Sequence, residues 1–183
     1  MEDRIISRKV YIVTHADKEK GPNPGLTANG KREISWLVDL LPKNPSEVVC
    51  GTGARHFDTV EALGLEVTRY TAVVGGPESG VKDADGIFHV QYPDGRTFPK
   101  KEGLETTVED MSVAQVMLIR YTLPNNSVII AGRPLMIGLD REGLRNSMKS
   151  TSVYVVEFNK SGNFCQIRAL AEDGDIGAGK DEL

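Results

Sequence analysis

Three basic side chains of the chain follow runs of apolar and β-branched residues, at the places where buried strands are expected to end. These side chains are His15, Arg55 and Arg133. A histidine at a strand end can serve as a nucleophile, a general base or a ligand. The planar arginine fork is suited to oxyanions such as phosphate. If the three strands are neighbours, this set of residues indicates chemistry on a phosphate group.

The loop Gly51-Thr52-Gly53 strengthens this interpretation, because it leads into a helix expected to start near Ala54. The backbone N–H groups and the dipole at a helix N-terminus favour an anion. We therefore predict that Thr52 and Arg55 bind phosphate. The neighbouring His56 is expected to point elsewhere on the helix.

The elements that must position these residues alternate between strand-like and helix-like patterns. The predicted strands are 9–14, 47–50, 65–74 and 127–131, the predicted helices are 27–41, 54–63 and 107–123, and the predicted hairpins lie over 87–98 and 151–170; 75–80 is expected to be a loop. This alternation predicts an α/β fold with helices on both faces of the sheet. Ligands of such sheets lie outside the carboxyl ends of the strands, so the three basic residues should meet in one crevice.

Composition places the chain among ordinary globular proteins. It has 183 residues, of which 39% are hydrophobic and 26% are charged, and a net charge of −4. We expect one domain over residues 1–171 and a mobile tail over 172–183. The acidic balance argues against nucleic acid and anionic membranes as partners. No apolar run is long enough to span a membrane and no signal peptide is visible, so we expect a cytoplasmic protein and regard the C-terminal Lys-Asp-Glu-Leu as a chance match to a retention signal.

No metal site or cofactor is expected. The three histidines are scattered, no metal-ligand spacing occurs, and the Gly-Thr-Gly loop lacks the third glycine of a dinucleotide-binding pattern. Cys50 and Cys165 lie in strand-like runs and are interpreted as small buried hydrophobes rather than a disulfide.

Two segments resemble the histidine phosphatase (phosphoglycerate mutase-like) superfamily. The run Tyr11–Ala16, followed by Leu-Thr-Ala-Asn-Gly from Leu26, is similar to the opening of that family. The segment Cys50–Leu63, with Arg55 and Thr59, is similar to its Arg-x-x-x-Thr-Ala helix. The resemblance covers roughly residues 9–170. It implies a three-layer α/β/α sandwich with a mostly parallel central sheet.

The resemblance also implies roles for individual residues. In that family the first histidine is transiently phosphorylated, two arginines and a second histidine hold the phosphoryl group, and a Glu or Asp protonates the leaving oxygen. His15 matches the nucleophile and Arg55 the second arginine. Thr14 stands at the position of the first arginine and Gly132 at that of the second histidine.

Phosphate-binding roles are therefore assigned to Arg55, Arg133, Thr14 and Thr52. Glu78 lies in the region of the family's acid and is the first candidate for that role. The other candidate acids are Glu105, Glu109 and Asp110.

Two functions remain open at this point. The first is a phosphomonoester hydrolase or phosphoryl transferase, weak or altered, that acts through phospho-His15. The alternative is an inactive relative that binds a phosphorylated ligand or a protein partner. Losing one clamp donor typically costs about 2.7–4 kcal/mol, and Arg133 and His56 are the candidates to compensate. The expected partner is a small phosphorylated molecule or a phosphoprotein, and exposed edges would allow a homodimer.

Overall fold

The computed structural model describes residues 5–77, 79–82, 84–85, 88–91, 97–99, 113–131 and 149–172. Several predictions from the sequence lie outside these residues: the acid candidates Glu78, Glu105, Glu109 and Asp110, the residues Gly132 and Arg133, and the tail beyond 172.

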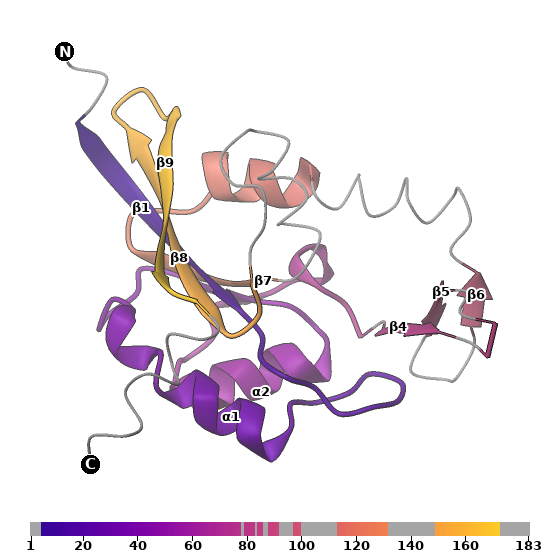
Figure 1. Ribbon diagram of the computed structural model, residues 1–183. Helices are drawn as coiled ribbons and strands as arrows, with labels where there is room; N and C mark the ends of the chain where they lie inside the picture. Colours follow the sequence, from indigo (N-terminus) through magenta and orange to yellow (C-terminus); the bar gives the residue numbers. More distant parts are fainter. Residues whose placement is uncertain are drawn as a thin grey trace.

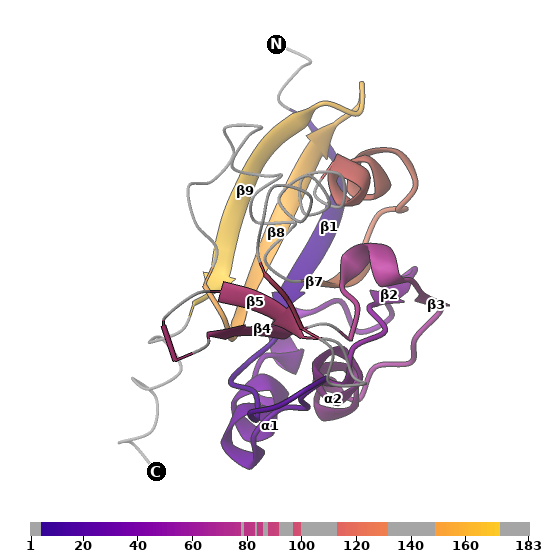
Figure 2. The same cartoon turned by 90° about the vertical axis from the view of Figure 1, so that its right-hand side faces the viewer.

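A six-stranded mixed sheet forms the centre of the molecule (Figure 1). Its strands are β1 (Ile6–Thr14), β2 (Val48–Cys50), β3 (Arg69–Tyr70), β7 (Ser127–Ala131), β8 (Ser152–Asn159) and β9 (Phe164–Ala171). Their order is β3-β2-β7-β1-β8-β9. The pairs β3–β2, β2–β7 and β7–β1 are parallel, whereas β8 and β9 form an antiparallel hairpin beside β1, as Figure 2 shows.

The helices begin and end at signals that the sequence carries. Helix α1 (Ala28–Ser35) is capped by Thr27, whose Oγ1 accepts the Gly30 N–H at 2.9 Å. Helix α2 (Ala54–Leu63) ends at Gly64, which has a φ of 64°. Short 3₁₀ turns follow, η2 (Val38–Leu40) and η3 (Ala72–Val74), and residues 113–121 form a further helix.

Helices cover both faces of the sheet, because alternate strand residues enter two separate cores. On β1, Val10 and Ile12 pack with Ile119 of the 113–121 helix, while Val13 packs on the opposite face with residues of α1 and α2. Strand β7 alternates in the same way. The prediction of a three-layer α/β/α sandwich with a mostly parallel sheet is therefore confirmed.

A second, three-stranded sheet lies to one side of the first (Figure 1). It consists of β4 (Ser79–Lys82), β5 (Phe88–Gln91) and β6 (Thr97–Pro99) in antiparallel order. The β5–β6 hairpin was predicted. The loop predicted over 75–80 is wrong at its end, because residues 79 and 80 pair with β5.

The strand predicted over 65–74 is wrong for most of its length. Only Arg69 and Tyr70 pair with β2, after which Thr71 accepts the Val73 N–H at 3.3 Å and caps a 3₁₀ turn. The turn brings Gly75 back to the end of β2, where its carbonyl accepts the Thr52 N–H at 2.8 Å.

The loop between β1 and α1 is folded back onto α2. A bridge between Lys18 and Leu26 closes it, and Asp58 Oδ2 on α2 accepts the Leu26 N–H at 2.7 Å. Gly25 lies so close to this carboxylate that a Cβ there would overlap it. The other oxygen of Asp58 forms an ion pair with Lys31 at 3.0 Å. This carboxylate therefore ties the loop 17–26 to both helices.

Replacing Asp58 should release this loop. We expect Asp58→Ala to lower the free energy of unfolding by about 1.5–3 kcal/mol, since a charged hydrogen-bond acceptor is lost, and to speed tryptic cleavage after Lys18 and Lys20. Urea unfolding and limited proteolysis measure the two effects. Glu61→Ala is the control, because its carboxylate is 77% exposed and lies 3.6 Å from Lys31. Equal effects of the two variants would contradict the anchoring role of Asp58.

Candidate active site

His15 follows β1 directly, and its ring is held in one tautomer. Its Nδ1 lies 3.0 Å from the carbonyl oxygen of Ala16. Because a carbonyl can only accept, Nδ1 carries the hydrogen of this bond. In the neutral ring, Nε2 then holds the free lone pair. The backbone on either side is fixed as well, since the His15 carbonyl accepts the Thr151 N–H at 3.2 Å.

The surroundings of His15 favour this neutral form. Burial lowers the pKa of His15 from its ordinary value of 6.5, and the positive charges of Arg55 and Lys18 lower it further, while the bond to Ala16 opposes them. His15 is therefore uncharged at neutral pH, with Nε2 ready to act as a base or a nucleophile.

Arg55 provides a positive charge at the N-terminus of α2. It is the second residue of the helix, and its guanidinium folds back toward Gly53, where a Cβ would lie 3.0 Å from Nη1. The Ala54 N–H is bound by Asn23 Oδ1 at 2.8 Å, so the loop after β1 also contacts this end of the helix. Thr52, predicted as a phosphate ligand, lies just before it on the same loop.

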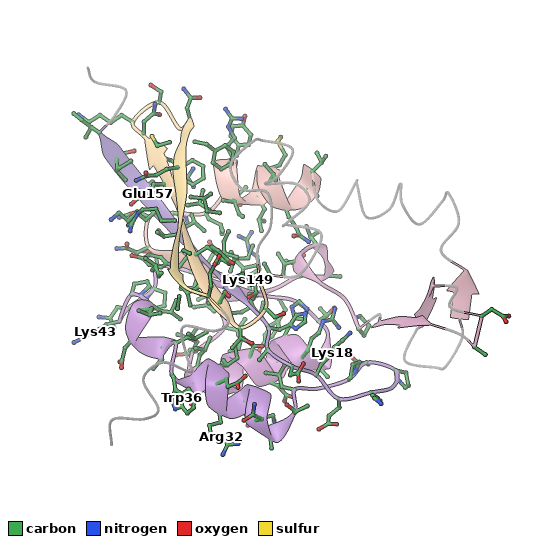
Figure 3. The ribbon with its side chains drawn as sticks, in the orientation of Figure 1. Lys18, Arg32, Trp36, Lys43, Lys149 and Glu157 are labelled. Atoms are coloured by element: carbon green, nitrogen blue, oxygen red, sulfur yellow. The ribbon has the colours of Figure 1, made fainter. Side chains whose placement is uncertain are left out.

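Lys18 adds a second positive charge that the sequence analysis did not single out. Burial and the charge of Arg55 lower the pKa of Lys18, so the two cations lie in each other's field. Figure 3 shows Lys18 beside α2, on the loop that leaves β1. Its position three residues after His15 could have suggested that Lys18 lies in the site. Whether it does depends on how the loop folds, which the sequence does not show.

His56 lies in the same site, so the expectation that it points elsewhere is wrong. Its ring centroid is 6.1 Å from that of His15, with an angle of 49° between the ring planes. Side chains in the first turn of a helix tilt toward its N-terminus, so consecutive residues can both reach the same ligand position. Gly51 and Gly75 make room, because a Cβ on either would overlap the imidazole.

The imidazole of His56 is fully buried and neutral. Burial lowers its pKa well below 6.5, and the charges of Arg55 and His15 act in the same direction. A hydrogen-bond contact with the Ile130 backbone opposes this shift. Among the residues that the structure describes, however, neither ring nitrogen has a partner at hydrogen-bond geometry.

Thr14 is placed differently from the other predicted residues. Its hydroxyl donates to the Lys149 carbonyl at 2.7 Å and accepts the Ser152 N–H at 3.1 Å. The side chain is 4% exposed. It therefore ties β1 to the start of β8, and its hydroxyl hydrogen is not directed at a ligand.

A polar network supports the same corner of the sheet. The buried Tyr154 hydroxyl accepts the Lys149 N–H at 2.7 Å and donates to the Glu172 carboxylate at 2.9 Å. Lys149 Nζ forms an ion pair with the same carboxylate at 3.4 Å. This network fixes residues 149–151, which in turn hold Thr14 and His15.

The described part of the chain contains no cluster of His, Cys, Asp or Glu that could hold a metal ion. Cys50 is buried, which raises the pKa of its thiol to about 12, whereas Cys165 is partly exposed, contrary to its expected burial. None of the helices in the described ranges has the length and apolar character needed to cross a bilayer.

No family model matches the sequence, and no curated protein matches it either. Solved structures do match. Rv3214 from Mycobacterium tuberculosis aligns with a TM-score of 0.59 and 16% identity, over 90% of this chain and 96% of that protein. The mycobacterial glucosyl-3-phosphoglycerate phosphatase Rv2419c aligns at 0.54 and 13%, over 90% and 98%. The protein histidine phosphatase SixA, complexed with tungstate, aligns at 0.51 and 17%, over 88% and 96%.

The chain has the histidine phosphatase fold. The resemblance drawn from the sequence motifs is thus confirmed at the level of the fold. Within that fold, His15 and Arg55 are brought together as predicted, and Lys18 and His56 join them.

Acidification should destabilise the protein through the two histidines of the site, whose pKa values are lowered. With the pKa of His56 lowered in the folded state, the unfolded chain binds a proton that the native state does not, once the pH falls below 6.5. Stability is therefore highest above pH 6.5 and falls as the pH decreases, by up to about 1.4 kcal/mol per pH unit for one such group.

His56→Leu removes this titration and should flatten the dependence, and urea unfolding between pH 7.5 and 5 measures it. His15 contributes in the same direction and remains in the variant. Parallel stability curves for the two proteins would show that the pKa of His56 is the same in the folded and unfolded states.

Proposed function

We propose that this protein is a phosphomonoester hydrolase or phosphoryl transferase that acts through a phosphohistidine at His15. The observation that carries the proposal is the bond from Nδ1 of His15 to the Ala16 carbonyl. It leaves Nε2 with a lone pair, and burial beside Arg55 and Lys18 keeps that nitrogen unprotonated at neutral pH. A neutral nucleophile surrounded by cations suits a dianionic substrate.

The reaction would proceed in two displacements. Nε2 of His15 attacks phosphorus, and the N–P bond forms as the bond to the ester oxygen breaks. The departing oxygen takes a proton from a general acid, for which Glu78 remains the predicted residue. Water, or an acceptor hydroxyl in a transferase, then attacks phosphorus and gives its proton to the carboxylate of the general acid, which is thereby restored. The N–P bond breaks, and phosphate or the phosphorylated acceptor leaves neutral His15 behind.

The cations would supply most of the catalysis. Phosphoryl transfer spreads negative charge over the oxygens, so the protein acts mainly through positioning and electrostatic stabilisation. Arg55 offers a fork of N–H donors at the start of α2, and Lys18 offers a point charge from the facing loop. Lys18 thus brings a cation into a site whose motif has Thr14 in place of an arginine. The substrate class we propose is a small phosphorylated molecule or a phosphoprotein.

His15→Asn tests the nucleophile with little change in shape. Asparagine keeps an N–H at the position of Nδ1 and has no group at the position of Nε2. We expect the wild type to acquire an acid-labile, base-stable phosphoryl group from a labelled aryl phosphate and to turn the ester over. We expect His15→Asn to lose the phosphoryl group and at least about 10³-fold in turnover.

His89→Asn on β5 is the matched control, since it removes the remaining histidine of the chain, and it should behave as the wild type. The proteins are purified side by side to exclude a contaminating phosphatase. Equal turnover by wild type and His15→Asn would contradict the proposal. Phosphate binding without phosphoenzyme or turnover would favour the alternative, a binding protein.

A further inference from the structure

His56 is buried in a way that a purely structural histidine rarely is. Its side chain is 0% exposed, yet its ring has only a contact with the Ile130 backbone that falls short of full hydrogen-bond geometry. Neither ring nitrogen has a partner at that geometry within the described part of the chain. Buried polar groups are almost always paired, since an unpaired one destabilises the fold. Local departures from this rule are concentrated at functional sites.

The space that the His56 ring fills exists because two neighbouring residues are glycines. It lies between Gly51, at the end of β2, and Gly75, which has a φ of 151° and leaves room where any side chain would overlap the imidazole. The His56 ring centroid lies 6.1 Å from that of His15, with the two ring planes tilted by 49°. At this separation, a group attached to His15 is within reach of an N–H on the second ring.

The position of the ring relative to β7 adds a second argument. The His56 ring has a hydrogen-bond contact with the Ile130 backbone that opposes the lowering of its pKa, and β7 ends one residue later. The sequence continues with Gly132, at the position where the resemblance predicts a second histidine. An imidazole from α2 therefore lies at the end of the strand whose own next residue has no side chain.

We propose that His56 is the second phosphoryl-binding histidine of this site and donates a ring N–H to the phosphoryl group held by His15. The proposal rests on the proposed function, because that function places the phosphoryl group on His15. Arg55 and Lys18 supply charge, whereas His56 supplies a directed donor that adds no further charge. The single N–H of the neutral ring then makes a hydrogen bond of full geometry only when the anion is bound.

A functional and a structural His56 differ in what its removal does to stability. If the ring only fills space, His56→Leu costs stability and leaves phosphate binding intact. If the ring N–H instead binds an anion, His56→Leu removes a polar group that lacks a full hydrogen bond in the free protein. The free energy of unfolding then stays equal or rises, while phosphate affinity falls.

Calorimetric binding of inorganic phosphate at pH 7.5, with thermal unfolding of the same samples, separates the two cases. We expect His56→Leu to weaken phosphate binding by about 10- to 100-fold, the range for a hydrogen bond to a charged group. His56→Gln retains an N–H donor and should bind within about fivefold of wild type. Phe57→Leu on the same helix is the control, since its side chain is 45% exposed, and it should bind as wild type.

Unchanged affinity in His56→Leu, or equal losses in the Leu and Gln variants, would overturn the proposal; His56→Met replaces His56→Leu if the latter does not fold. Trapping of phospho-His15 separates this inference from the proposed function. A wild-type phosphoenzyme with phosphate affinity independent of His56 would overturn only the role of His56. Phosphate affinity that depends on His56, without any phosphoenzyme in the wild type, would support the binding role and overturn the catalytic one.

Discussion

Parallel pairing of β1, β7 and β2 is the constraint on which the site depends. The register places Thr14 beside Ala131 and Val49 beside Ile129, so the three strands run to the same edge of the sheet. His15, the Gly51–Gly53 loop and the end of β7 meet there because parallel strands share the direction of their carboxyl ends. A change of register would separate the two imidazoles.

The electrostatics of the site follow from what is gathered at this edge. The positive charges of Arg55 and Lys18 act on each other and on the half-buried His15 ring, and the charge of Arg55 also acts on the buried His56 ring. Both imidazoles therefore have lowered pKa values and are uncharged at neutral pH. Loss of the imidazole charge leaves His15 nucleophilic and His56 a neutral donor. An anion bound between Arg55 and Lys18 would relieve the mutual repulsion of these cations, which is consistent with the proposed phosphate chemistry.

Local signals predicted most of the fold. The strand predicted over 9–14 and the helix predicted over 54–63 each follow from residues that are neighbours in sequence, and each is present in the structure. The failures are non-local. The strand predicted after Leu65 is cut short by the Thr71 turn. Strand β5 was predicted, but no local pattern shows that residues 79 and 80 pair with it.

The site was predictable only where a motif existed. The resemblance identified His15 and Arg55 because its motifs include them. To predict that Lys18 lies in the site, one would need to know that Asp58 holds its loop against α2. The inward position of His56 depends on two glycines, Gly51 and Gly75, which are far apart in the sequence and come together only in the folded chain. It could therefore not be predicted from local sequence. Thr14 was predicted to bind phosphate because it stands at the position of the family's first arginine. Its hydroxyl instead forms hydrogen bonds between β1 and the start of β8.

The central claim is that His15 offers an unprotonated Nε2 at neutral pH. Long-range ¹H–¹⁵N correlation spectra of the histidine rings, recorded across pH on wild type and His15→Asn for assignment, test it directly. The account predicts a His15 ring protonated at Nδ1 alone at pH 7, with a pKa below the ordinary 6.5. A His15 ring that is protonated at Nε2, or that is an imidazolium at pH 7, would contradict it.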